Sequence, residues 1–115
     1  MARADSSSAP ANAATVAQRL IAENDCCAIL GAFASALTLA ISEVTERRGV
    51  PLITMSCSDL LTSRGFRNVF QVTPKGSVIG MAQFNMATDL VASAGKVSKV
   101  AILFEGHRIN GLKPH

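Results

Sequence analysis

The chain has 115 residues, of which 49% are hydrophobic and 17% are charged. This length allows one domain, the apolar content excludes a disordered chain, and no apolar run approaches the roughly 20 residues that span a bilayer. The net charge is +3, but the basic residues are scattered and Trp and Tyr are absent, which argues against nucleic-acid binding because little aromatic surface remains for stacking bases.

Apolar periodicity divides the chain into alternating helices and strands, with one helical turn expected in the loop 56–64. Each predicted strand is apolar throughout, which is typical of a strand covered on both sides. The sequence therefore predicts an α/β fold with a doubly wound, mainly parallel sheet and helices on both of its faces. The predicted helices cover 13–24, 35–48 and 76–94, and the predicted strands cover 26–30, 50–54, 68–72 and 99–104.

The two ends of the chain differ from this central pattern. Residues 1–12 are a polar lead-in, residues 13–105 carry the alternating elements, and residues 106–115 have no apolar periodicity. The lead-in lacks the apolar stretch of a signal peptide, so we expect the chain, expressed as written, to stay in the cytoplasm. A doubly wound domain usually opens with a strand, and none precedes the first predicted helix, so the sequence indicates truncation at both ends.

The end of the predicted strand 26–30 is a candidate ligand site. Ser35 and Ala36 follow it at the start of a predicted helix, where the first backbone N–H groups lack partners within the helix. These N–H groups and the Ser35 hydroxyl suit an anion such as a carboxylate. The alternative is that Ser35 only caps the helix, since Ser is a preferred N-cap residue. Phe33 is either a pocket residue or part of the core.

A second candidate site follows the predicted strand 50–54. Ser56 and Ser58 offer hydroxyl groups, and the loop around Cys57 offers a backbone carbonyl, which together suit an ammonium group. Open α/β sheets place their ligand crevices at such carboxyl ends of strands. An anion site beside a cation site predicts a zwitterionic ligand such as an amino acid. The alternative is that Ser58 only begins the next helical turn.

The sequence offers little for catalysis or metal binding. Cys26, Cys27 and Cys57 have no metal-type spacing, and three cysteines do not make a disulfide framework. We expect Cys26 and Cys27 to be buried as small apolar groups in a strand. Cys57 is a candidate nucleophile with His107 as its base, but it lacks the flanking glycines of a nucleophile elbow. We therefore expect no enzyme activity, no catalytic residue, no metal and no cofactor.

Several segments between about Asp5 and Glu105 match one protein family in order and with plausible spacing. They are 13–21 (AATVAQRLI), 28–35 (AILGAFAS), 46–53 (ERRGVPLI), 61–66 (LTSRGF) and 69–74 (VFQVTP). Through them the chain resembles part of the amino-terminal lobe of type I periplasmic substrate-binding proteins, in the branched-chain amino acid class that serves ABC transporters. Members of this family have two lobes that close on a ligand like a hinged clamp.

The resemblance implies a solute-binding component of an ABC uptake system for branched-chain amino acids or related amides. It implies a periplasmic location and a membrane permease as partner. It also implies that Ser35 and nearby backbone amides hold the ligand carboxylate, and that the loop of Ser56, Cys57 and Ser58 receives the ligand ammonium group.

Residues 106–115 depart from the family pattern, and the lobe's first strand and helix and the second lobe have no counterpart. We therefore expect a truncated component with negligible ligand affinity on its own, since small-molecule sites bury most of their ligand. Exposed apolar surface and an open sheet edge predict self-association. Two alternatives are a ligand-sensing or regulatory domain of the same fold and a non-functional gene fragment.

Overall fold

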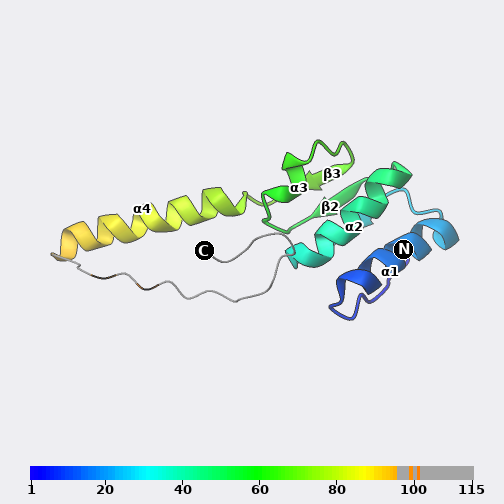
Figure 1. The fold of residues 1–115 in the computed structure, drawn as a ribbon, viewed down its shortest axis with the longest axis horizontal. Coiled ribbons are helices and arrows are strands. Elements are labelled where there is room, and N and C mark those ends of the chain that lie inside the picture. Colours follow the sequence, from blue (N-terminus) through cyan, green and yellow to red (C-terminus); the bar gives the residue numbers. More distant parts are fainter. Residues whose placement is uncertain (96–98, 100, 102–115) are drawn as a thin grey trace. The chain divides into compact units, whose positions relative to one another are not determined.

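The computed structural model describes residues 1–95, 99 and 101. The chain forms two compact units, Met1–Ile79 and Gly80–His115. Within the described residues, no helix combines the length and the apolar character needed to cross a lipid bilayer. The elements in chain order are α1 (Pro10–Asn24), β1 (Ile29–Leu30), α2 (Ser35–Arg48), β2 (Leu52–Thr54), α3 (Leu60–Ser63), β3 (Val69–Gln71) and α4 (Gly76–Ala94) (Figure 1).

The three strands form one parallel sheet in the order β1-β2-β3. Leu30 of β1 lies opposite Ile53 of β2, which in turn lies opposite Phe70 of β3. The parallel α/β architecture predicted from the sequence is therefore confirmed. Parallel neighbours place the carboxyl ends of all three strands at one edge of the sheet, where the loops leading to α2 and α3 begin.

The strands are shorter than the sequence predicted, and β1 shows why. Ile29 N–H donates to the carbonyl of Pro51 at 2.8 Å, and Gly31 N–H donates to the carbonyl of Ile53 at 3.0 Å. The next rung toward the start of β1 would need an N–H at Pro51, and proline has none. The ladder therefore begins at Ile29, and Cys26 and Cys27 lie before the strand, half-buried and exposed, rather than buried within it as predicted.

The helix boundaries follow local chemistry. Helix α1 begins at Pro10, three residues before the predicted start, because proline fits the first turn of a helix, where no internal N–H bond is required. Helix α2 ends as predicted at Gly49, whose positive φ of 65° lets its N–H bond the carbonyls of Glu46 and Thr45. The one-turn helix α3 and the long helix α4 are also confirmed. The predicted strand 99–104 and the tail 106–115 lie outside the described residues, apart from Lys99 and Ala101.

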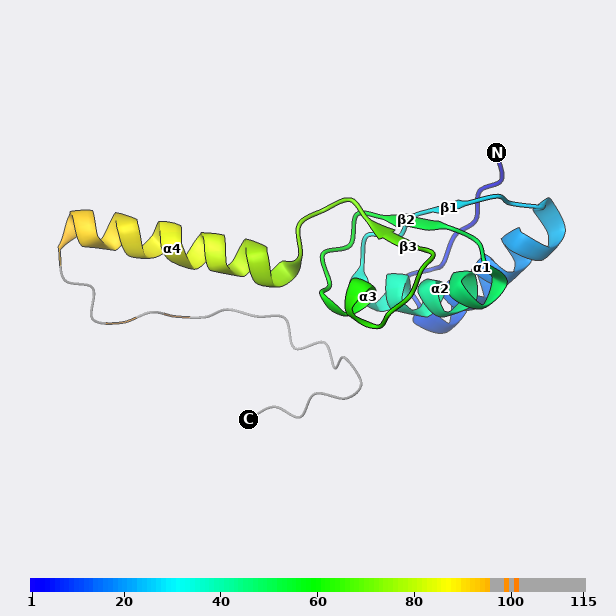
Figure 2. The same cartoon turned by 90° about the horizontal axis from the view of Figure 1, so that it is seen from above.

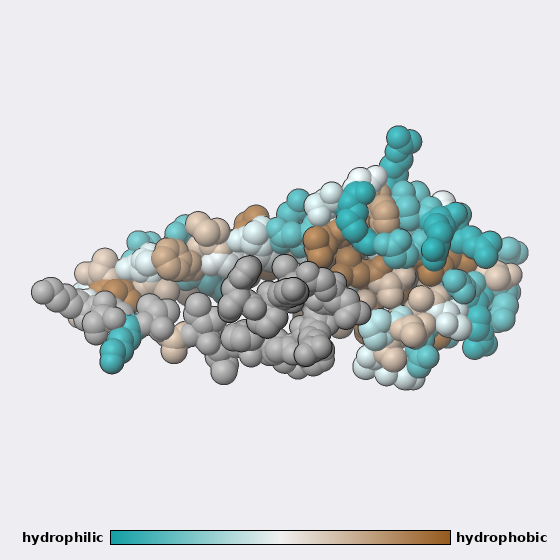
Figure 3. Space-filling view, in the orientation of Figure 1, coloured by the Kyte–Doolittle hydropathy of each residue, from teal (hydrophilic) through white to brown (hydrophobic). Residues whose placement is uncertain are grey.

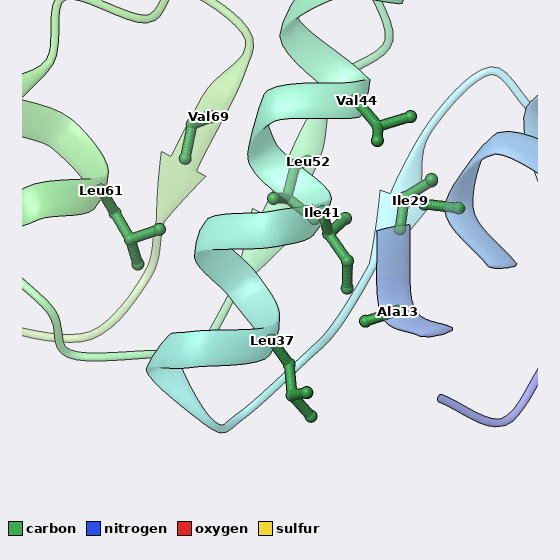
Figure 4. Close-up of a cluster of buried hydrophobic side chains, with 9 residues drawn as sticks. Ala13, Ile29, Leu37, Ile41, Val44, Leu52, Leu61 and Val69 are labelled. Carbon is green, nitrogen blue, oxygen red and sulfur yellow. The ribbon is translucent and has the colours of Figure 1, made fainter. Parts of the chain in front are cut away.

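Helices α1, α2 and α3 pack on one face of the sheet (Figure 2). Leu52 of β2 and Leu61 of α3 are fully buried, and Val44 of α2 is 2% exposed. Figure 4 shows these three side chains with other members of the cluster, which come from helices and strands on both sides of α2 in the view. The buried apolar cluster consists of Ala13, Ala17, Ile29, Leu37, Ile41, Val44, Leu52, Leu61 and Val69.

The opposite face of the sheet is apolar but open within the unit Met1–Ile79. Leu30, Ile53 and Phe70 form one row across the three strands and are 69%, 38% and 51% exposed. Met55 and Val72 extend this row because side chains two residues apart share a face. This apolar row contrasts with the face of the molecule drawn in Figure 3, on which hydrophilic and apolar side chains are interspersed. Both faces of the strands are therefore apolar, as predicted for a sheet that is covered on both sides. Within this unit, helices cover one of the two faces.

Polar contacts tie the carboxyl-terminal half of α2 to the segment before β3. Arg64 pairs with Glu43, and its guanidinium lies 4.3 Å from the ring centre of Phe66. The Glu46 carboxylate accepts the backbone N–H groups of Arg67 and Asn68, both at 2.9 Å. These two backbone bonds hold the pKa of Glu46 below its usual value.

Candidate ligand-binding site

The two predicted junctions meet at the carboxyl edge of the sheet. Ser35 is the first residue of α2, and Ser56 follows β2 by two residues. Their Oγ atoms lie 2.9 Å apart, within hydrogen-bonding distance, and either hydroxyl can donate. Two segments 21 residues apart in the sequence are therefore joined by a direct contact between the very hydroxyl groups that the sequence singled out.

A buried network of two threonines supports this contact. The carbonyl of Ala32 accepts the hydroxyl of Thr38 at 3.0 Å and that of Thr54 at 2.8 Å. Thr54 Oγ1 in turn accepts the N–H of Ser56 at 3.1 Å. Thr38 is 0% and Thr54 1% exposed. The network fixes the loop before α2 against the end of β2, and thereby fixes the relative positions of Ser35 and Ser56.

The amino terminus of α2 carries no side-chain cap. The N-cap residue is Ala34, which has the extended backbone angles φ −66° and ψ 127°. Interpreting Ser35 as the cap is therefore wrong, because Ser35 already lies inside the helix and its hydroxyl contacts Ser56. An uncapped helix start presents backbone N–H groups and the positive end of the helix dipole. Ala36, the second helical residue, is exposed there, and this environment favours an anion.

The residues of the second junction differ in exposure. Ser56 is 1% exposed, Ser58 is half-buried and Cys57 is exposed. The Ser58 carbonyl accepts the N–H of Leu61 at 3.2 Å, so Ser58 does begin the turn of α3. A carbonyl oxygen has two lone pairs, so a carbonyl bonded once can still accept a second donor.

Phe33 stands apart from the core. Its side chain is 81% exposed at the edge where β1 ends, so the interpretation of Phe33 as a core residue is wrong. An exposed aromatic side chain beside a polar edge is suited to contact the apolar part of a ligand. The candidate pair of Cys57 and His107 is not tested, since His107 lies outside the described residues. Among the residues that the structure describes, no three metal-binding side chains come together.

A family model described as "Periplasmic binding protein" matches residues 1–109. The chain belongs to this family. An "Amino acid binding protein" of Pseudomonas aeruginosa is 29% identical over 106 residues, which are 91% of this chain and 27% of that protein. "Leu/Ile/Val-binding protein homolog 7" of Brucella abortus is 32% identical over 95 residues, 77% of this chain and 24% of that protein.

A solved structure supports the same assignment. The leucine-binding protein LivK of Thermotoga maritima superimposes with a TM-score of 0.68 at 31% identity, over 75% of this chain and 25% of that one. The family is periplasmic, and the similar proteins are binding proteins rather than enzymes, which confirms the resemblance and the expectation of a non-enzyme. The chain spans about a quarter of the length of these relatives.

Sequence reasoning missed Thr38 and Thr54, the two threonines that support the site. Both lie in otherwise apolar stretches, where a hydroxyl residue is easily read as a tolerated core position. The available signal was placement, since Thr54 ends a predicted strand and Thr38 falls in the first turn of a predicted helix. A buried threonine at such a junction needs a hydrogen-bond partner, and the loop carbonyl of Ala32 supplies one for both.

Proposed function

We propose that this chain supplies part of the ligand site of a periplasmic solute-binding protein for branched-chain amino acids or related amides. The observation that carries the proposal is the contact between Ser35 and Ser56 at the uncapped start of α2. The relatives named as amino acid and Leu/Ile/Val binding proteins supply the ligand class.

The ligand carboxylate binds at the start of α2 in this proposal. The Ser35 hydroxyl and the Ala36 N–H donate to it, and the helix dipole stabilises its charge. Ser56 is almost completely buried, so its hydroxyl acts through Ser35: when Ser35 donates to the carboxylate, Ser56 donates to Ser35 in the Oγ–Oγ bond. This bond holds the Ser35 side chain in one rotamer before the ligand arrives, which reduces the entropy lost on binding.

The ligand ammonium group binds at the second junction. Cys57 is exposed, and its carbonyl accepts one hydrogen bond within the protein and retains a second lone pair for the ammonium group. The Ser58 hydroxyl adds a second acceptor, while the buried Ser56 shapes the loop that carries both. The Phe33 side chain covers the apolar part of the ligand. A protein of this kind would present its ligand to an ABC permease in the membrane, and it would act in the periplasm.

The experiment that tests the proposal is a titration of the chain with L-leucine, followed by amide chemical shifts. The chain spans a quarter of its relatives, so it buries a smaller part of the ligand than a closed clamp does. We expect a dissociation constant no tighter than about 1 mM, since affinity depends on ligand burial. The Ser35→Ala variant should abolish the shifts near residues 33–38. Thr15→Ala removes an exposed hydroxyl on α1 and should leave binding unchanged.

We also propose that a second copy of the chain covers the open sheet face in solution. Five large apolar side chains are exposed there, namely Leu30, Ile53, Met55, Phe70 and Val72. Burying them would remove roughly 300–500 Å² per copy from water, if a fully buried apolar side chain removes about 100 Å². Stable interfaces bury about 800 Å² per partner. The expected dimer is therefore weak and forms only at high protein concentration.

A further inference from the structure

The loop after β2 is also held by residues that follow β3. Thr73 follows β3, and its Oγ1 lies within hydrogen-bonding distance of two carbonyls, that of Met55 at 3.2 Å and that of Ser56 at 3.0 Å. The one hydroxyl hydrogen is therefore within reach of two consecutive peptide carbonyls of this loop, and the carbonyl of Ser56 is the nearer. Thr73 lies 17 residues from Ser56 in the sequence, so the contact depends on the pairing of β2 with β3.

The backbone of Gly76 also contacts this loop. Its N–H donates to the carbonyl of Cys57 at 2.6 Å. A Cβ atom added to Gly76 would lie 3.1 Å from that carbonyl oxygen and 3.5 Å from Oδ1 of Asp59. The first distance is tighter than an ordinary van der Waals contact, so a side chain at this position would push the Cys57 carbonyl away.

Asp59 adds a third contact between this loop region and the start of α4. Its carboxylate accepts the N–H of Ser77 at 3.0 Å and also the Ser77 hydroxyl. These bonds, that of the Ser77 hydroxyl first, hold the pKa of Asp59 below its usual value, and nearby Lys75 acts in the same direction. The carboxylate therefore stays charged at neutral pH, and it binds the first turn of α4.

We propose that Thr73, Gly76 and Asp59 are positioning residues that fix the ammonium-accepting loop 56–58 against the start of α4. This inference rests on the proposed function, and it assigns the direction of the Cys57 carbonyl to contacts between its loop and the residues that follow β3. The carboxylate half of the site has its own support in Thr38, which bonds the carbonyl of Ala32, and Thr54 joins the two halves because it bonds both Ala32 and Ser56.

The bond between Gly76 and Cys57 involves no residue at the start of α2, which leads to a specific expectation for ligand binding. Disturbing the contacts at 73–77 should weaken recognition of the ammonium group and spare recognition of the carboxylate. The two can be compared with L-leucine and 4-methylpentanoate, which share the carboxylate and the branched side chain but differ in the ammonium group. A hydrogen bond to a charged group contributes about tenfold to affinity, so the wild-type chain should prefer leucine by at least that factor.

The decisive variant is Gly76→Ala, and Gly80→Ala is its matched control. Both changes replace a glycine of α4 by alanine, but a Cβ at Gly80 meets nothing within 4 Å. We expect Gly76→Ala to lower leucine affinity about tenfold while 4-methylpentanoate affinity changes less than twofold. Gly80→Ala should leave both affinities unchanged. A loss of preference in Gly80→Ala, or an unchanged preference in Gly76→Ala, would overturn the inference.

Thr73 gives a second and independent test. Thr73→Val keeps the shape of the side chain and removes the hydroxyl, whereas Thr73→Ser keeps the hydroxyl. We expect the preference for leucine to fall in Thr73→Val and to return in Thr73→Ser. Equal losses for both ligands in Thr73→Val would mean a general structural role and would refute the assignment. A wild-type chain that binds both ligands alike would instead refute the proposed ammonium site itself.

Discussion

Replacing Thr54 by Val removes one buried hydroxyl and leaves the shape of the side chain almost unchanged. The hydroxyl donates to the Ala32 carbonyl at 2.8 Å and accepts the Ser56 N–H at 3.1 Å. Losing the bond to Ala32 costs about 1 kcal/mol, and leaving the buried Ser56 N–H unpaired costs a further ~1–3 kcal/mol. We therefore expect Thr54→Val to lower the free energy of unfolding by about 2–4 kcal/mol.

Thr38→Val is the matched comparison, since Thr38 is equally buried. Its hydroxyl lies 3.0 Å from the carbonyls of Ala32 and Ala34. Each of these carbonyls keeps another donor, because Thr54 Oγ1 still bonds Ala32 and the Thr38 N–H bonds Ala34 at 3.0 Å. No group is left unpaired, so the loss in unfolding free energy should be only about 0.5–1.5 kcal/mol.

Urea unfolding followed by circular dichroism at low protein concentration measures both changes, with the slope of the transition as a check on the unfolded state. Hydrogen exchange adds a local readout, since the Ser56 amide should lose protection in Thr54→Val and keep it in Thr38→Val. Equal losses of unfolding free energy in the two variants, or an equally protected Ser56 amide, would refute the reasoning that an orphaned N–H dominates the cost.

Three further predictions concern the core, the open sheet face and acid stability. Leu52→Ala, at a fully buried position, should lower the unfolding free energy by about 2–5 kcal/mol in urea titrations. Ile53→Lys should abolish concentration-dependent dimers in light scattering, whereas Val78→Lys, at an exposed apolar residue of α4, should not. The lowered pKa of Glu46 contributes stability that is present above its unfolded pKa and is lost as pH falls through the folded one. Glu46→Gln should therefore flatten the loss of stability below about pH 4.5 in pH-dependent urea midpoints.

Much of the fold follows from local pattern, and the exceptions have identifiable causes. Gly49 ends α2 where the sequence places it, because a left-handed C-cap is a local property. The length of β1 was not predictable from its own residues, since it is set by the missing N–H of Pro51 on the neighbouring strand. The apolar outer row of the sheet agrees with the predicted two-sided strands, although helices of the unit Met1–Ile79 cover one face.

Some residues of the candidate site could likewise be predicted from the sequence, and others could not. Ser35 and Ser56 were predictable because each lies just beyond the carboxyl end of a strand, and parallel pairing brings such ends together. The supporting residues were not, because their roles depend on partners far along the chain. Thr54 reaches back 22 residues to Ala32, and Asp59 reaches forward 18 residues to Ser77. Side-chain hydrogen bonds of this range depend on the tertiary structure and leave no periodic signal in the sequence.

The orientation of the ligand is tested most directly by comparing the Ala36 and Ser58 amide shifts on titration with L-leucine and with L-leucinamide. Leucinamide keeps the ammonium group and lacks the carboxylate. If the carboxylate binds at the start of α2, leucine should move both amide signals and leucinamide should move only that of Ser58. An Ala36 signal that responds equally to both compounds, or to neither, would contradict the account.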